Sequence, residues 1–321
     1  MSTPYIPVID ISPLYQDDAS AWQPVAEQID LACQNSGFFY IKGHAISAAQ
    51  MQTIMDLAKS FFALPLEEKL KIDITQSHHH RGYGAIATEQ LDPQRPGDFK
   101  ETFDMGRHLS ATAPEVIAGK PLHGANQYPE LANFQRLMED HYQQMLELGK
   151  TVLKGIAVAL GIEPDFFDHR FTHPISVLRL IHYPPHEAKQ DAEQIGAGAH
   201  TDYGCITVLY QDGSGGLQVR HRNGEWIDAP PIEGTFVINI GDMMARWSND
   251  RYTSTPHRVI NPQGIERYSS PFFVEPNFDT DIYCLEGCQS EQVPAKYPPI
   301  SAGEYLLSRF NDTYAYRKTT E

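Results

Sequence analysis

The sequence predicts a mainly β fold in which a β-sandwich or jelly-roll core has flanking helices packed on one outer face. From residue 175 onwards, short runs of apolar and β-branched residues alternate with turn sequences such as DGSGG, RNGE and NPQG. Many short strands at this spacing are typical of a sandwich or jelly roll. The first half instead contains long stretches of helical periodicity, and no flexible linker or repeat separates the halves. We therefore expect one compact unit.

The N-terminal region is expected to alternate strands and helices. Residues 6–12 (IPVIDIS) and 38–44 (FFYIKGH) are rich in β-branched and aromatic residues, which favours strands. Between them, residues 24–37 repeat apolar side chains at helical spacing and end in a glycine, a common helix C-cap. A second helix is expected over 47–64, where Ser47 can act as N-cap.

The middle of the chain changes from irregular to helical. Residues 75–126 are rich in Gly, Pro and His, which predicts loops, whereas residues 128–161 carry the longest helical pattern. Within that helix, Gly149 and Gly155 each cost about 1 kcal/mol relative to alanine. Such glycines indicate close packing against a sheet, or a bend. Among the strands expected after residue 175 is MMARWS, residues 243–248.

Composition and charge exclude several classes of protein. The formal net charge of −16 repels phosphate backbones, so nucleic acid is not an expected partner. No apolar run is long enough to span a bilayer, and MSTPYIPVIDISPLY lacks the features of a signal peptide. Four cysteines are too few for a disulfide framework, and the C-x3-C pair Cys284 and Cys288 has no companion pair that would suggest zinc. We expect a soluble, cytoplasmic protein with free thiols and no membrane partner.

The motif AHTDYG, residues 199–204, is the first candidate metal-binding element. In a strand, His200 and Asp202 would point to the same face, with Thr201 turned away. A third ligand is expected from His257 in STPHRVIN, which follows a strand, a turn and a second strand and could return to the same edge. Two histidines and one carboxylate form the facial triad that suits ferrous iron, whereas a structural zinc site would be closed and tetrahedral.

A candidate anion clamp follows the third ligand. Arg267 and Ser269 form an R-x-S pair on one face of a predicted strand that continues into PFFVE. A guanidinium beside a hydroxyl makes a planar two-point contact for a carboxylate. Burying this arginine among apolar residues without an anionic partner would be costly. The order H-x-D, distant His and R-x-S is far more specific than any of its parts.

These motifs belong to a larger set of stretches, spread over almost the whole chain, that resemble one known protein family. The chain resembles the isopenicillin N synthase-like family of iron(II)- and 2-oxoglutarate-dependent oxygenases, and its VEPNFD stretch and the tyrosine of AHTDYG look closer to bacterial members. The supporting stretches are IPVIDIS, GFFYIKGH, FFALPLEEK, RGYG, KETFDMG, IHYPP, GAHTDYGCITVLYQD, GGLQV, FVINIGDMMARWSND, STPHRV and RYSSPFF. The resemblance implies a cupin-like double-stranded β-helix. It divides the chain into an N-terminal dioxygenase region (5–125), a catalytic core (170–277) and a C-terminal helix (300–321).

The resemblance also implies roles for individual residues. It implies that His200, Asp202 and His257 hold Fe(2+), and that Arg267 and Ser269 grip the distal carboxylate of 2-oxoglutarate. Residue Tyr183, in the strand before PP, matches a tyrosine that often adds a hydroxyl to the same carboxylate. The implied reaction couples decarboxylation of 2-oxoglutarate by O2 to oxidation of a small molecule, with ascorbate as a candidate reductant.

One departure from the family pattern concerns the co-substrate pocket. Many plant members carry an asparagine two residues before the tyrosine, and Ile181 stands there in this chain. Three alternatives stay open: an oxidase of the isopenicillin N synthase type, which would use the clamp on its substrate, an ethylene- or succinate-forming enzyme, and a non-catalytic jelly-roll binding protein, against which the intact triad argues. The substrate pocket is expected from residues 81–91 (RGYGAIATEQL), 205–210 (CITVLY) and the segment after RYSS. Hydroxylation, desaturation and cyclisation remain open, as does the oligomeric state, with a monomer among the options.

Overall fold

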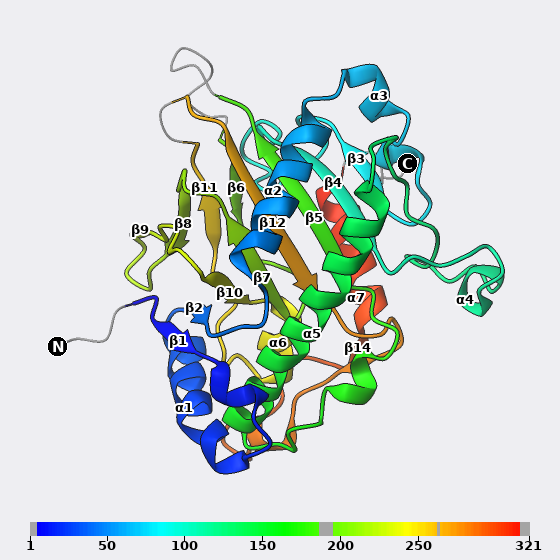
Figure 1. The fold of residues 1–321 in the computed structure, drawn as a ribbon. Coiled ribbons are helices and arrows are strands. Elements are labelled where there is room, and N and C mark those ends of the chain that lie inside the picture. Colours follow the sequence, from blue (N-terminus) through cyan, green and yellow to red (C-terminus); the bar gives the residue numbers. More distant parts are fainter. Residues whose placement is uncertain (1–4, 186–194, 262–263, 315–321) are drawn as a thin grey trace.

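The computed structural model describes residues 5–185, 195–261 and 264–314. Its strands form two sheets and a short ribbon (Figure 1). The larger sheet has the order β1-β2-β10-β7-β12-β5-β4-β3 and the smaller sheet the order β6-β11-β8-β9. The strands of the larger sheet are β1 (Val8–Asp10), β2 (Phe38–Lys42), β3 (Gly82–Gly84), β4 (Glu101–Gly106), β5 (Val177–Tyr183), β7 (Ile206–Gln211), β10 (Phe236–Ile240) and β12 (Arg267–Val274).

The remaining elements complete the roll and flank it. The smaller sheet contains β6 (Ala197–His200), β8 (Leu217–Arg220), β9 (Trp226–Asp228) and β11 (His257–Val259), and the ribbon pairs β13 (Asp281–Ile282) with β14 (Ile300–Ser301). The helices are α1 (Ala19–Asn35), α2 (Ala48–Phe62), α3 (Leu66–Leu70), α4 (Pro114–Ile117), α5 (Phe134–Leu160), α6 (Asp242–Trp247) and α7 (Ala302–Thr313). Short 3-10 helices are η1 (Ser12–Tyr15), η2 (Ile74–Gln76), η3 (Asp168–Phe171) and η4 (Glu286–Cys288).

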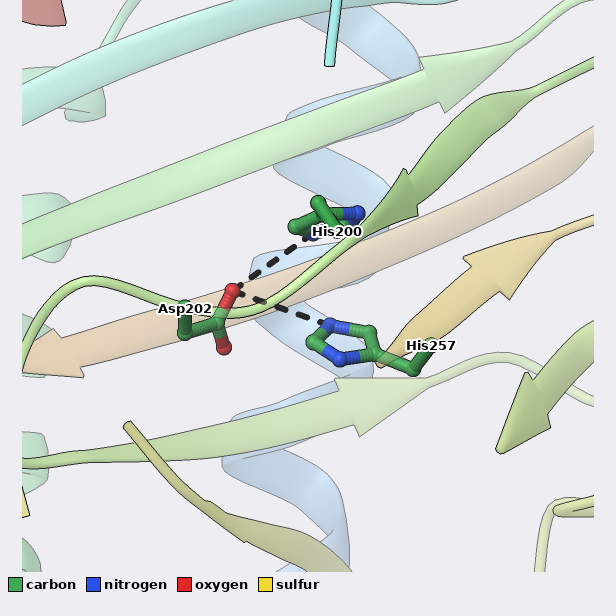
Figure 2. A group of neighbouring side chains, drawn as sticks. All are labelled: His200, Asp202 and His257. Carbon is green, nitrogen blue, oxygen red and sulfur yellow. Dashed lines mark ion pairs between the residues drawn. The ribbon is translucent and has the colours of Figure 1, made fainter. Parts of the chain in front are cut away.

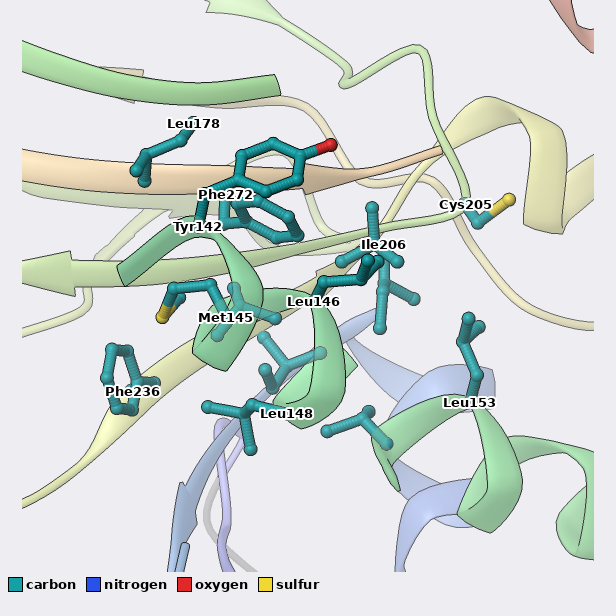
Figure 3. Close-up of a cluster of buried hydrophobic side chains, with 14 of the residues drawn as sticks. Tyr142, Met145, Leu146, Leu148, Leu153, Leu178, Cys205, Ile206, Phe236 and Phe272 are labelled. Atoms are coloured by element: carbon teal, nitrogen blue, oxygen red, sulfur yellow. The ribbon is translucent and has the colours of Figure 1, made fainter. Parts of the chain in front are cut away.

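Strand alternation divides the larger sheet into an outer and an inner face. On β12, Phe272 is fully buried in the outer hydrophobic core, where its ring meets Tyr142 of α5 edge-on with centroids 5.2 Å apart (Figure 3). The inner face instead contributes Ile181, Tyr183 and Leu209 to a second apolar cluster that also contains side chains of the smaller sheet. The interior between the sheets is therefore a separate compartment, lined from both sides. This arrangement confirms the predicted mainly β jelly roll.

Helices α1, α2 and α5 cover the outer face, as predicted (Figure 1). The glycines of α5 allow the close approach that the sequence indicated. A Cβ at Gly149 would lie 2.8 Å from Val274 Cγ2 of β12, and one at Gly155 would lie 2.8 Å from Ile29 Cδ1 of α1. Helix α7 is placed differently, because its Phe310 lines the interior compartment.

Two local predictions were wrong. Residues 243–248 form all but the first residue of helix α6 and its C-cap rather than a strand, because Gly241 precedes an aspartate in the first turn and Met, Ala and Arg are good helix formers. Residues 75–126, expected to be loops, contain β3 and β4, which extend the larger sheet beyond β5. The helix expected within 300–321 is α7, and residues 315–321 lie outside the described part of the chain.

Candidate active site

The two histidines of the candidate triad are neighbours across the smaller sheet. His200 is the last residue of β6 and His257 the first of β11, and the antiparallel register pairs them directly. Their ring centroids lie 4.3 Å apart (Figure 2). The strand pairing therefore brings together two residues that are far apart in sequence.

Asp202 reaches the histidines from a turn rather than from a strand. Strand β6 ends at His200, so the expectation that both residues share one strand face was wrong for Asp202. The turn is held by the backbone N–H of Asp242, which donates to the carbonyl of Asp202 at 2.8 Å. The Asp202 Oδ1 atom lies 3.5 Å from His200 Nε2 and 3.6 Å from His257 Nε2 (Figure 2). One ligand atom from each of the three residues lies within 4.8 Å of the others.

The histidine rings are oriented by backbone carbonyls. His200 Nδ1 lies 2.7 Å from the carbonyl oxygen of Gly198, and His257 Nδ1 lies 3.2 Å from that of Thr255. A carbonyl can only accept, so each Nδ1 carries a hydrogen in these contacts, and in the neutral form of each ring Nε2 keeps its lone pair. Both lone pairs are then available on the side of Asp202. Metal-binding histidines are usually oriented in this way, by a hydrogen bond from the ring nitrogen that does not bind the metal.

The carboxylate of Asp202 is oriented by two donors. Its Oδ2 accepts hydrogen bonds from the hydroxyl of Thr207 at 2.5 Å and from the side-chain amide of Asn239 at 2.7 Å. Oδ1 is left facing the two histidines. The three donor atoms therefore converge before any cation is bound, and nitrogen, nitrogen and oxygen suit a divalent transition metal.

Burial and charge set the pKa values of this cluster. Burial lowers the pKa of His200, but the carboxylate of Asp202 outweighs burial and the pKa is raised. Burial, followed by the charge of His200, lowers the pKa of His257 to about 4. Burial raises the pKa of Asp202, but the two histidines and the Thr207 hydroxyl hold it well below its usual range. The cluster thus offers an ionised carboxylate and a neutral imidazole, which a cation requires.

Arg267 lies in the same cavity as the triad, with only 1% of its surface exposed. Its Nε donates to the carbonyl of Gly215 at 2.8 Å, and its Nη1 donates to the hydroxyl of Ser269 at 3.1 Å. Tyr183 is its cross-strand partner on β5, and the ring centroid lies 4.6 Å from the guanidinium carbon. Ile181 occupies the next inward position of β5, opposite Ser269. This end of the cavity therefore presents a fixed cation and a hydroxyl.

The other end of the cavity contains a buried ion cluster that sequence reasoning missed. Arg179 of β5 makes a two-point contact with Asp104, at 2.6 and 2.8 Å, and its Nη1 lies 3.1 Å from Glu89 Oε2. Lys100 Nζ lies 2.8 Å from Glu89 Oε2, and the hydroxyl of Tyr314 donates a hydrogen bond to Glu89 Oε1 at 2.5 Å. All five residues line the cavity. A signal for the arginine was available, since it shares a strand face with the predicted co-substrate tyrosine, four positions away.

Glu275 is a second cavity residue that the sequence reasoning did not single out. It follows β12 at an odd position, like Arg267 and Ser269, and is 3% exposed. Burial raises its pKa to about 8, although the charge of Arg81 acts in the opposite direction. Each of the three stretches expected to build the substrate pocket contributes to the cavity. The contributing residues are Glu89 and Leu91 from 81–91, Thr207 and Leu209 from 205–210, and Pro271, Phe273 and Glu275 from the segment after RYSS.

A jelly roll with a convergent two-histidine, one-carboxylate donor set is typical of non-haem iron oxygenases. Family models match both halves of the chain. Residues 6–131 match the model for the non-haem dioxygenase in morphine synthesis N-terminal region, and residues 174–276 match the 2OG-Fe(II) oxygenase superfamily. The chain belongs to the 2OG-Fe(II) oxygenase superfamily.

Individual relatives agree with this family. A 2-oxoglutarate-Fe(II) type oxidoreductase of Emericella nidulans is 39% identical over 97% of this chain and 92% of its own length. A homoarginine-6-hydroxylase of Oryza sativa is 40% identical over 95% of this chain and 96% of its own length. The crystal structure of a full-length Neurospora crassa protein in complex with alpha-KG superposes with a TM-score of 0.86, at 34% identity, over 97% of this chain and 99% of that chain.

The protein is accordingly a 2-oxoglutarate- and Fe(II)-dependent dioxygenase that acts on a small molecule and uses ferrous iron, 2-oxoglutarate and O2. Among the described residues, no helix has the length and apolar character needed to cross a membrane.

Proposed function

We propose that the protein hydroxylates a small nitrogen-containing molecule at a ferrous ion held by His200, Asp202 and His257. The observation that carries this proposal is the convergence of their Nε2, Oδ1 and Nε2 atoms in the cavity that also contains Arg267. Such a facial set leaves coordination positions for 2-oxoglutarate and O2. The bound iron supplies the activation of O2 that no side chain can provide.

Arg267, Ser269 and Tyr183 are proposed to hold the distal carboxylate of 2-oxoglutarate. The guanidinium has five N–H donors, of which one goes to Gly215 and one to Ser269, so three remain for an anion. The Ser269 hydroxyl accepts from Arg267 and can donate its own hydrogen to the carboxylate. A carboxylate bound here would be oriented at two points by donors that are themselves fixed in the cavity wall.

The balanced reaction is substrate R–H plus 2-oxoglutarate plus O2 giving R–OH, succinate and CO2. The roles of this chain are to orient the co-substrate, to exclude water and to place one C–H bond near the metal. Hydroxylation is favoured over desaturation or cyclisation by three relatives of 39–41% identity named homoarginine-6-hydroxylases. Two further structures of the Neurospora protein contain thymine or 5-formyluracil, which are also small nitrogen compounds.

The experiment is an anaerobic reconstitution followed by a substrate screen. Iron-loaded protein with 2-oxoglutarate should form the visible absorbance band of the chelate, and L-homoarginine and thymine head the panel of substrates. With a true substrate, the amount of succinate formed should equal the amount of product, and the product should contain one more oxygen atom than the substrate. Product formed without 2-oxoglutarate would instead support an oxidase of the isopenicillin N synthase type. Release of ethylene, or of succinate without any added substrate, would support an ethylene- or succinate-forming enzyme.

Finer assignments belong to the same proposal. We infer an isopenicillin N synthase-like bacterial member, with a cytoplasmic location supported by four free cysteines. We retain the division into 5–125, 170–277 and 300–321, which the matched ranges 6–131 and 174–276 support. All proposed ligands come from one chain, so a monomer would suffice, and the charge of −16 disfavours nucleic acid.

A further inference from the structure

Five inward-facing residues of β12 and its extension line the cavity from end to end. Arg267 and Ser269 lie at the co-substrate end, and Pro271, Phe273 and Glu275 continue the same face towards the ion cluster. Glu275 packs against the turn that carries Asp202, since a Cβ at the glycine of that turn, residue 204, would lie 2.9 Å from Glu275 Cγ. The carboxyl group of Glu275 is thus fixed in the cavity, on the side away from Arg267.

Glu275 lacks the partners that the neighbouring charges have. Arg179 and Lys100 are both engaged by carboxylates, and Lys100 also lies 2.7 Å from Asp98. Glu275 Oε2 is buried and has no hydrogen-bond partner among the described residues. The guanidinium of Arg81 donates through Nη1 and Nη2 to the carbonyls of residues 80 and 122, and its Nε makes no hydrogen bond to Glu275 or to any other described residue. A buried carboxyl oxygen without a partner is costly unless a ligand supplies one.

The charges around Glu275 favour a cationic ligand group. The ion cluster contributes two carboxylates and two cations, and Asp98, bound to Lys100 behind the cavity wall, adds a third carboxylate. The buried guanidinium of Arg81 is a third cation close to both Asp104 and Glu275. These six charges cancel, so ionised Glu275 leaves one negative charge in the cavity wall. A substrate ammonium or guanidinium would offset this charge and would donate to the unpartnered oxygen, whereas an anionic group would be repelled.

We propose that Glu275 is a substrate-binding residue that selects substrates bearing a basic nitrogen group, such as a guanidinium. This inference rests on the proposed function, because it places the cation at the substrate end of the oxygenase cavity. The Glu275 carboxylate accepts hydrogen bonds from the cationic group and so holds the rest of the molecule beside the turn that carries Asp202.

The test compares two probes that differ in this group alone. L-homoarginine carries a guanidinium, and L-homocitrulline carries an uncharged ureido group on the same chain. Each is titrated anaerobically into the protein loaded with iron and 2-oxoglutarate, with calorimetry for affinity and the visible band for the state of the site. The variants are Glu275→Gln, which keeps the shape, and the control Glu266→Gln, whose side chain is 57% exposed and lies just before β12.

The parent and Glu266→Gln should bind homoarginine more tightly than homocitrulline, and Glu275→Gln should lose about 10- to 100-fold of homoarginine affinity. The affinity for homocitrulline should change little in Glu275→Gln, so the ratio of the two affinities reports the contact between Glu275 and the guanidinium. If Glu275 had only a structural role, the substitution would lower both affinities. Equal binding of the two probes by the parent, failure of both to bind, or an unchanged ratio in Glu275→Gln would overturn the inference. Absence of the iron–2-oxoglutarate band in the parent would instead refute the proposed function.

Discussion

Replacing Arg267 by alanine should weaken 2-oxoglutarate binding without affecting iron. The side chain is 1% exposed, and the three N–H bonds left after Gly215 and Ser269 are proposed to face the distal carboxylate. Removing one partner of a buried, hydrogen-bonded charge pair costs about 2–5 kcal/mol. At about 1.4 kcal/mol per factor of ten, this is roughly a 30- to 4,000-fold loss of affinity.

The assay is anaerobic titration of 2-oxoglutarate into iron-loaded protein, followed by the visible band of the chelate. Arg267→Lys should recover only part of the loss, because an ammonium cannot make the planar two-point contact. Ser269→Ala and Tyr183→Phe each remove one hydroxyl and should cost about 1–3 kcal/mol. Arg220→Ala, at an exposed residue of β8, is the matched control and should behave as the parent. Parent-like affinity in Arg267→Ala would refute the clamp and favour an oxidase that uses Arg267 on its substrate.

Further predictions concern the metal ligands, their support, the core and the effect of pH. The double variant His257→Ala, Asp202→Ala should retain almost no iron after anaerobic loading and desalting, and full retention would contradict the triad. Asn239→Ala removes a donor from Asp202 Oδ2 and should lower iron affinity by about 10- to 100-fold in a chelator competition; no change would mean that this contact does not orient the carboxylate. Phe272→Ala empties a fully buried site and should lower the free energy of unfolding by about 3–5 kcal/mol in urea, with iron affinity unchanged. Burial raises the pKa of Glu275 to about 8, so the carboxylate forms as pH rises, and homoarginine affinity should increase between about pH 7 and 9 in the parent but not in Glu275→Gln; a flat profile in the parent would contradict this.

The sequence allowed the chemistry-bearing residues to be named before the fold was known. H-x-D, the later histidine and R-x-S are local patterns, and strand alternation assigned Arg267 and Ser269 to one face, where the structure places both in the cavity. The same rule failed for Asp202, because β6 stops at His200 and a turn, not a pleat, directs the carboxylate.

Long-range partners could not be derived from local patterns. The sequence around Asp202 does not predict that Asn239 of β10 donates a hydrogen bond to it, because that contact depends on which strands become neighbours in the sheet. The ion cluster is harder still to predict from the sequence, since Glu89 and Arg179 are 90 residues apart in the chain. The wrong prediction for α6 had a different cause. The aspartate and the good helix formers of this segment could be read from the sequence, but its position among predicted strands led to a strand assignment.

The ion cluster has a consequence for how relatives of this enzyme can be recombined. Glu89, Lys100 and Asp104 lie within the segment matched by the N-terminal family model, whereas Arg179 lies within the segment matched by the oxygenase model and Tyr314 lies beyond both. A chimaera that joined the first segment of one relative to the second segment of another would inherit unmatched charges in the buried wall of the cavity. These positions are therefore expected to vary together along a lineage, and substrate range should evolve by coordinated replacement across the three segments rather than by exchange of any one.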